Sequence, residues 1–110
     1  MIEQNIIGLC VRGDLDPLET GLHEDEFLTA HHRQIWATLK EIRYKKMACD
    51  VISATEALSC SNSTYDWFTI LKNMSDNAVS VYSAPTHIQK IKEAYKINKL
   101  RSIGEEIAAS

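Results

Sequence analysis

A chain of 110 residues can bury one hydrophobic core without disulfides or metals, so we expect a single domain over residues 1–110. Twelve basic residues against fifteen acidic ones give a net charge of −3, which disfavours a dedicated binder of duplex DNA held by phosphate neutralisation. Three widely spaced cysteines, with no signal peptide and no run of about 18 apolar residues, exclude a disulfide scaffold and a membrane span and favour a soluble, cytoplasmic protein.

The first predicted helix begins near the N-terminus, where Ile2, Ile6 and Leu9 recur at steps of four and three residues and so share one helical face. Gly13 stands where a C-terminal cap is expected. The Asp-Pro pair at 16–17 indicates the start of a second, brief helix, because aspartate accepts an early amide and proline lacks a donor that the first position would not use.

Residues 23–28 form an acidic connector in which Phe27 is the expected apolar anchor. A longer amphipathic helix is predicted over about residues 30–46. Its apolar side carries Ile35, Trp36, Leu39 and Ile42. Its basic residues are Arg33, Lys40, Arg43, Lys45 and Lys46. Residues 1–30 carry one basic and seven acidic groups, whereas residues 31–50 carry five basic and two acidic ones, a polarity that can orient a partner.

Two further short helices are predicted from their capping signals. Ser53 with Glu56 forms a capping box, and Ser63 with Asp66 forms a weaker one ahead of a second apolar run. The stretch 75–84 is small, polar and aperiodic, which predicts a loop or a single turn.

Pro85 opens the last predicted helix, which can run to the end of the chain. Its apolar side shifts around the helix axis near Asn98, because two stripes are separated by a five-residue step. We expect the first stripe to pack on the chain's own core and the second to face another surface, such as another subunit. The first stripe is Ile88, Ile91 and Tyr95, and the second is Leu100, Ile103 and Ile107.

No segment alternates as a strand does, so the sequence predicts an all-α bundle of about six helices. Trp36, Trp67 and Phe68 sit at helical spacing among aliphatic residues and are expected in the core rather than on a base-stacking platform.

No pattern in the sequence indicates catalysis. His31 and His32 diverge by about 100° on a helix, which is a poor geometry for sharing a metal, so structural roles are expected. Cys10 and Cys49 are expected to be small buried or half-buried residues, and Cys60 completes the three thiols. The four glycines never fall into a GxxxxGK[ST] or GxGxxG motif, so we expect no nucleoside triphosphate, cofactor or metal on this chain.

Four segments, taken in order, resemble the N-terminal domain of DnaB-type replicative DNA helicases. Residues 3–8, EQNIIG, resemble the first helix of that family. Phe27 followed by HRQIW at 32–36 resembles its next pattern, and Asp50 matches the aspartate that ends the following loop. Arg101 resembles the arginine of the long helix that leads out of the domain.

This resemblance implies a small orthogonal bundle as a head, over about residues 1–96, and a helical hairpin that starts at about residues 97–110. In that family, pairs of hairpins build a collar of dimers above a hexameric motor that uses ATP and Mg²⁺, and primase or a helicase loader docks on the collar. The chain would then be a non-catalytic oligomerisation and docking domain of a DNA replication enzyme in a bacterial or phage-infected cell. It would meet DNA only through the full-length helicase.

Three alternatives to a domain cut from a larger helicase stay open. The chain can be a free-standing homologue, such as a phage decoy, or a regulator that binds a host helicase and blocks its loader. It can also be a small nucleic-acid-binding module. In that case its phosphate contacts would come from the predicted basic helix, through Arg33, Lys40, Arg43, Lys45 and Lys46.

Overall fold

Helices make up all the regular structure of the residues that the computed structural model describes, which are 2–61 and 64–109 for the backbone and 2–61 and 64–100 for the side chains. The predicted all-α fold is confirmed. The brief helix expected after Asp16 is a 3-10 turn, which leaves five α-helices in the described chain. They are α1 (Ile2–Arg12), α2 (Ala30–Tyr44), α3 (Val51–Ser61), α4 (Trp67–Asn77) and α5 (Ala84–Ala109), with the 3-10 turns η1 (Pro17–Glu19), η2 (Glu24–Glu26) and η3 (Val81–Ser83).

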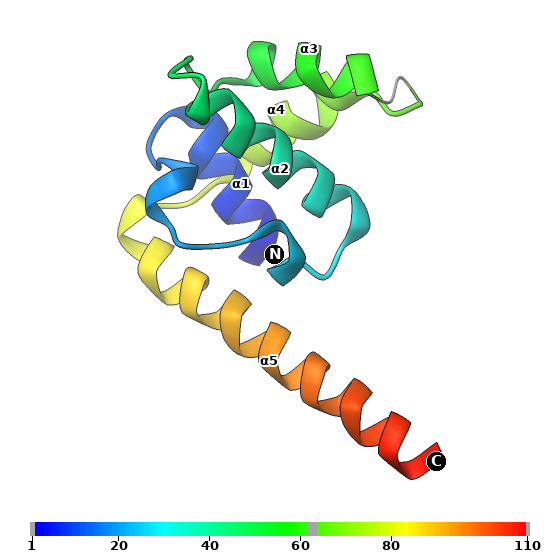
Figure 1. Cartoon of the computed structure of the whole chain (residues 1–110). Coiled ribbons are helices and arrows are strands. Elements are labelled where there is room, and N and C mark those ends of the chain that lie inside the picture. The colour runs from blue at the N-terminus through cyan, green and yellow to red at the C-terminus, as the bar shows by residue number, and fades with distance from the viewer. Residues whose placement is uncertain (1, 62–63, 110) are drawn as a thin grey trace.

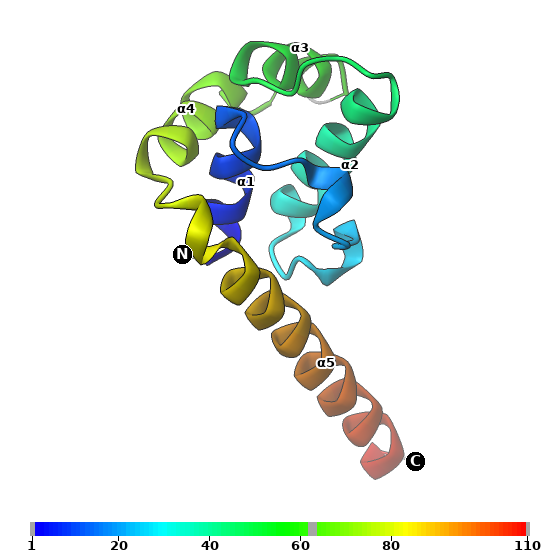
Figure 2. The same ribbon diagram turned by 90° about the vertical axis from the view of Figure 1, so that its left-hand side faces the viewer.

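The first helix, α1, is the centre of the head. Its sequence is apolar on nearly every side, and a helix of that kind is stable only when it is surrounded. Figures 1 and 2 show α1 between α4 and α2, with α3 bridging those two helices and α5 leaving from below. The residues of α1 that lie in the core are Asn5, Ile6, Ile7, Gly8, Leu9, Cys10 and Val11.

The close crossing of α1 and α4 depends on Gly8. A Cβ atom at this position would lie 2.7 Å from the carbonyl carbon of Met74 and 3.0 Å from the Cβ of Ala78. Carbon atoms in ordinary contact stand about 3.5–4.0 Å apart. Only a residue without a side chain therefore allows α4 to lie this close to α1.

Several predicted helix boundaries and anchors are confirmed. Gly13 ends α1 with a φ of +90°, a conformation that favours glycine. The side chain of Asp16 accepts a hydrogen bond from the N–H of Leu18 at 3.0 Å and so caps the turn that Pro17 begins. Phe27 is fully buried against Trp36, with ring centroids 4.9 Å apart.

The predicted start of α3 is wrong by three residues, because the cap is Asp50 and not Ser53. The helix begins at Val51, and the Asp50 carboxylate accepts a hydrogen bond from the N–H of Ser53 at 2.7 Å. Ser53 is therefore inside the first turn as a donor and is not the cap. Asp50 and the predicted Ser53–Glu56 capping box are alternative N-caps for this helix, since Asp50 lies three residues before the N–H that it accepts from.

The fourth helix corrects the sequence predictions at three points. Asp66 is its cap, with 3.3 Å from its Oδ1 to the backbone nitrogen of Thr69; Ser63, the predicted cap, lies outside the described residues. The helix continues to Asn77, where a loop had been expected from residue 75. Phe68 is 46% exposed and not in the core, because its neighbour Trp67 points inward and successive helical side chains diverge by about 100°.

Candidate functional site

The last helix begins in the head and then extends away from it (Figures 1 and 2). Its first predicted stripe packs on the head, since Ile91 is buried and Ile88 and Tyr95 are half-buried. Further along, Ile97 is 58% exposed and Leu100 is 69% exposed. The chain therefore leaves large apolar side chains uncovered on the part of α5 that projects.

Leu100 lies where the sequence predicts an interface, on the exposed part of the helix. Ile103 and Ile107, the other two predicted interface residues, lie outside the residues whose side chains the structure describes. Ile97 was missing from the predicted set, because it belongs to neither apolar stripe of the sequence. The predicted interface stays a prediction.

The side chain of Asn5 links α1, the central helix, to the first turn of α5. Its side-chain oxygen accepts a hydrogen bond from the N–H of Val79 at 2.7 Å, and this bond fixes which end of the amide is nitrogen. The amide nitrogen therefore donates to Nδ1 of His87, 2.8 Å away. Both partners are far from Asn5 in sequence, so no local pattern could have predicted the contact.

Arg12 provides a second connection between α1 and the segment before α5. Its guanidinium donates hydrogen bonds to the carbonyl oxygens of Ala78 and Val79, at 2.9 and 3.0 Å. Arg12 also pairs with Asp14 at 2.7 Å. Residues of α1 therefore bond both to the segment just before α5 and to the first turn of α5. These contacts fix the direction in which α5 leaves the head.

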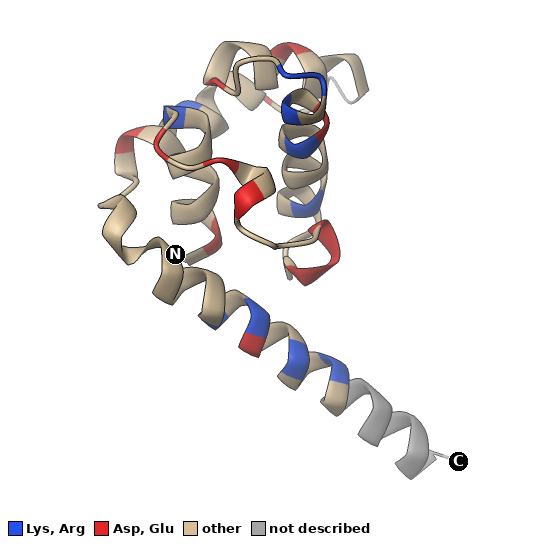
Figure 3. Ribbon diagram, turned by 60° about the vertical axis from the view of Figure 1, so that its left-hand side comes forward, with Lys and Arg blue, Asp and Glu red and all other residues tan. Residues whose placement is uncertain are grey.

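Most of the predicted phosphate-binding residues have partners inside the chain. Figure 3 marks where basic and acidic residues lie along the ribbon. Arg33 donates to the carbonyl oxygens of Phe27 and Leu28 at 2.7 and 3.0 Å. Lys40 pairs with Glu24 at 3.4 Å.

Arg43 pairs with Asp16 at 3.3 Å and also donates to the carbonyl oxygen of Met47 at 3.1 Å. Although burial raises the pKa of Asp16, the bonds from the Leu18 N–H and from Arg43 outweigh it and lower that pKa. The cation and its carboxylate thus hold η1 against the last turn of α2.

The remaining two lysines of the basic set are the most open. Lys45 pairs with Glu41 one turn earlier at 3.2 Å, and both side chains are well exposed. Lys46 is exposed at the end of α2 with a φ of +58° and makes no ion pair with any described residue. Phosphate contact by the basic set stays a prediction, and the internal pairing favours the reading in which these residues stabilise and solubilise the head.

The two adjacent histidines occupy different environments. His32 is buried and donates from Nδ1 to the carboxylate of Glu3 at 2.8 Å, while the other oxygen of Glu3 accepts from the N–H of Leu28 at 3.0 Å. Burial raises the pKa of Glu3, but these hydrogen bonds outweigh it and hold the pKa below its ordinary value. His31 is half-buried, and its partial burial lowers its pKa. In the described part of the chain, no group of three or more His, Cys, Asp or Glu side chains could hold a metal ion.

The thiols have the environments that the sequence predicts. Cys10 is buried and Cys49 is half-buried. Burial raises the pKa of both thiols, and that of Cys49 reaches about 11. Thiols of this kind stay protonated near neutral pH, and a protonated thiol is a weak nucleophile.

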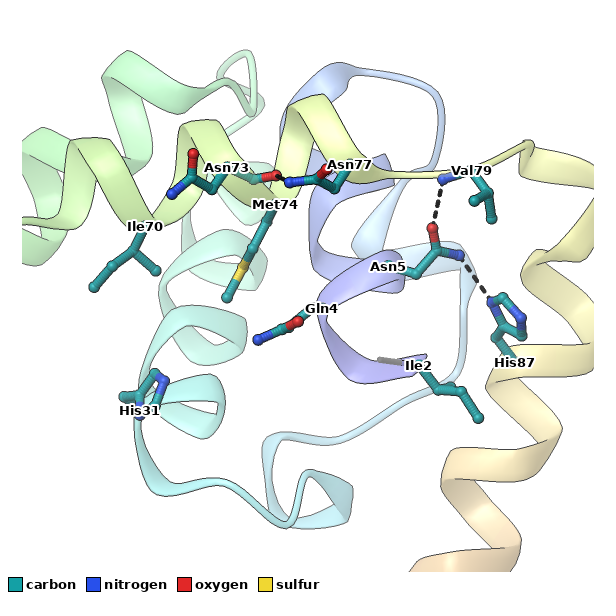
Figure 4. Close-up of a pocket in the computed structure, with 10 residues that line it drawn as sticks. All are labelled: Ile2, Gln4, Asn5, His31, Ile70, Asn73, Met74, Asn77, Val79 and His87. Atoms are coloured by element: carbon teal, nitrogen blue, oxygen red, sulfur yellow. Dashed lines mark hydrogen bonds between the residues drawn. The ribbon is translucent and has the colours of Figure 1, made fainter.

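A cleft of about 510 Å³ lies beside α1, between α4, the start of α2 and the first turn of α5 (Figure 4). It is lined by apolar residues together with carboxamides and two imidazoles. None of its lining residues is Asp, Glu, Lys or Arg. The apolar residues are Ile2, Ile70, Met74 and Val79, and the polar ones are Gln4, Asn5, His31, Asn73, Asn77 and His87.

Comparison with known proteins gives one family. The sequence model described as the DnaB-like helicase N terminal domain matches residues 1–93. None of the curated proteins compared with the chain matches it. Within the described residues, no helix combines the length and apolarity that crossing a bilayer requires.

Proposed function

Because the chain belongs to the family of DnaB-like helicase N-terminal domains, we propose that it is the assembly and docking domain of a replicative DNA helicase. In this proposal, copies of the chain pair through the projecting part of α5, as the first step toward a hexamer. The paired domains then offer a platform to primase or to a helicase loader in the cytoplasm of a bacterial or phage-infected cell.

The observation that carries this proposal is the exposed apolar surface of α5. Ile97 and Leu100 are more than half exposed on a helix that has left the head. Burying an Ile or Leu side chain contributes about 1.5–3 kcal/mol, so covering these residues would stabilise a pair of chains. A second copy of α5 can bury these side chains, which the head leaves exposed.

The proposal assigns no chemistry to this chain. Its two buried or half-buried thiols have raised pKa values, and the sequence contains no phosphate-binding glycine loop. ATP and Mg²⁺ would act in a motor domain of the parent helicase, where they would supply the energy for unwinding. The head would contribute to DNA replication through assembly and recruitment.

Sedimentation velocity with paired variants tests the proposal. The wild-type chain is expected to sediment as a dimer whose population rises with concentration, and Leu100→Asp combined with Ile103→Asp is expected to shift it to monomer. Tyr82→Asp is the matched control, since Tyr82 is 91% exposed but lies in η3 rather than on the projecting helix. An unchanged dimer in the double variant, or a wild-type chain that stays monomeric at every concentration, would contradict the proposal.

A further inference from the structure

The carboxamide of Asn5 holds two partners through its two ends (Figure 4). Its Oδ1 accepts a hydrogen bond from the N–H of Val79 at 2.7 Å, and its Nδ2 lies 2.8 Å from Nδ1 of His87. A backbone N–H can only donate, so Oδ1 must face Val79, and Nδ2, which is a donor, must face His87. The bond to the main chain therefore fixes the orientation of this amide.

The fixed amide decides which protonation state of His87 fits the structure. A neutral imidazole carries its proton on one nitrogen and accepts at the other. Since Nδ1 of His87 faces a donor, Nδ1 is the acceptor and the proton lies on Nε2. A protonated imidazole has an N–H at both nitrogens, which would place two donors 2.8 Å apart. The bond between Asn5 and His87 therefore forms only while the ring is neutral.

Rotation of the Asn5 amide does not restore the bond. If Oδ1 turned toward a protonated His87, Nδ2 would face the N–H of Val79, and these two donors would lie 2.7 Å apart. Asn5 is only 8% exposed, so water has little access to the group that loses its partner. A buried polar group without a partner costs more free energy than an average hydrogen bond contributes. One of the two bonds must therefore break when His87 takes up a proton.

The cleft that His87 lines holds no carboxylate that would favour the protonated ring. Its lining among the described residues includes no Asp, Glu, Lys or Arg, α4 contributes only uncharged side chains, and the other titratable group is His31 of α2. The adjacent turn η3 has no charged residue, and on α5 itself Lys90 follows His87 by one turn. A neighbouring cation disfavours a charged imidazole.

The charged groups of the other elements packed against α5 are engaged away from the cleft. On α1, the carboxylate of Glu3 accepts bonds from the start of α2 and the residue before it, and Arg12 pairs with an aspartate of its own loop. In η2, Glu24 pairs with a lysine of α2, Glu26 accepts from the N–H that precedes its turn, and Asp25 is exposed. None of these groups lines the cleft, so a proton on His87 gains no counter-charge there.

The contact lies where α5 is attached to the head. His87 is in the first turn of α5, Asn5 is in the central helix, and Val79 is in the segment that leads into α5. We infer that Asn5 and His87 form a proton-sensitive latch, which holds the base of α5 to α1 while His87 is neutral and opens when the ring is protonated. The buried side chains of Ala84 and Ile91 keep the opened helix on the head. Histidine is the side chain that ordinarily changes charge between about pH 5 and 8.

The latch does not depend on the proposed pairing of two chains. The pairing surface lies further along α5, at Ile97 and Leu100, whereas the latch is at the base of the helix. A working latch in a chain that stays monomeric would refute the pairing alone. A dimeric chain without the latch would refute the latch alone.

NMR of the histidine rings tests the premise on the wild-type chain. The ¹⁵N chemical shifts of the two ring nitrogens show which of them carries the proton. At about pH 7.5 we expect the proton of His87 on Nε2, with Nδ1 unprotonated. A proton on Nδ1 at this pH, in either the neutral or the charged ring, would overturn the proposal.

Urea denaturation at about pH 7.5 and about pH 5 measures the consequence. The bond favours the neutral ring, so the stability that it provides is complete at the higher pH and is lost as His87 takes up a proton. The folding equilibrium constant of the wild type should therefore fall about tenfold further between the two pH values than that of His87→Gln. The matched control is His23→Gln, which removes an exposed histidine of η2 and should keep the wild-type pH dependence.

Asn5→Asp should reverse the sign of the effect. One carboxylate oxygen can still accept from Val79, and the other can accept from a protonated His87. In the Asn5→Asp background, His87→Gln should therefore increase the loss of stability on acidification, whereas in the wild-type background it should reduce that loss. Parallel losses in wild type and His87→Gln, or the same direction in both backgrounds, would overturn the proposal.

Discussion

Replacing Gly8 with alanine tests whether the close crossing of α1 and α4 determines the stability of the head. The new Cβ would lie 2.7 Å from the carbonyl carbon of Met74, which is backbone and cannot rotate away. Restoring an ordinary carbon–carbon separation of about 3.5–4.0 Å requires the helices to part by about 1 Å. Overpacking costs about 1–3 kcal/mol, and a clash with backbone atoms places Gly8→Ala in the upper part of that range, at about 2–3 kcal/mol. The better helix propensity of alanine offsets about 1 kcal/mol of this cost.

We therefore expect Gly8→Ala to lower the free energy of unfolding by about 1–2 kcal/mol, equivalent to a fall in Tm of about 4–16 °C for a domain of this size. Urea denaturation followed by circular dichroism measures the change. Ser59→Ala is the control, because Ser59 is exposed on α3 and its side chain makes no hydrogen bond with any described residue; it should change stability by less than about 0.5 kcal/mol. A Gly8→Ala variant as stable as the wild type would refute the reasoning.

Three further predictions concern the other contacts of the head. Asn5→Ala should destabilise the chain by about 1–3 kcal/mol in urea, because it leaves the N–H of Val79 and the ring of His87 without their partner; an unchanged midpoint would show that these bonds contribute nothing. The pKa of Glu3 is lowered in the folded chain, so the stabilisation that its carboxylate provides is complete above the ordinary carboxyl pKa of 4.5 and is lost as the pH falls through the lowered folded value. In an acid titration, Glu3→Gln should therefore lose stability less steeply than the wild type. Parallel curves for the two chains would count against this prediction. Fluorescence anisotropy at low salt should show no tight, salt-sensitive binding of DNA by the isolated chain, since most of the predicted phosphate-binding cations are paired internally; tight binding that weakens steeply with salt would instead support the nucleic-acid-binding alternative.

The parts of the fold that local chemistry decides were predictable from the sequence. Gly13 and Pro17 fix backbone conformations by their own covalent structure, so a cap and a turn could be placed on them. Phe27 and Trp36 are large and apolar, which makes burial the expected outcome whatever surrounds them.

Choices between neighbouring residues were less predictable. Trp67 and Phe68 are both aromatic, and only the rotation of α4 against the core decides which of them points inward. In the same way, Asp50 and Ser53 are both good caps, and the chain leading into α3 decided between them.

Contacts between distant segments left no pattern in the sequence. Asn5 and His87 are 82 residues apart, so their hydrogen bond depends on the whole head being assembled. The cleft has the same character, because Gln4 and the asparagines of α4 come together only when α1 and α4 cross. The surface of α5 was easier to anticipate, since a change in helical register is visible along one segment, as at Leu100.

The central claim is that a second copy of the chain covers the projecting part of α5, and hydrogen exchange of the amides of residues 96–100 measures this most directly. If the claim is correct, protection of these amides should rise as protein concentration increases about a hundredfold, because pairing buries the helix and follows mass action. Amides of α1, inside the head, should show constant protection over the same range. Protection in 96–100 that does not depend on concentration would contradict the account.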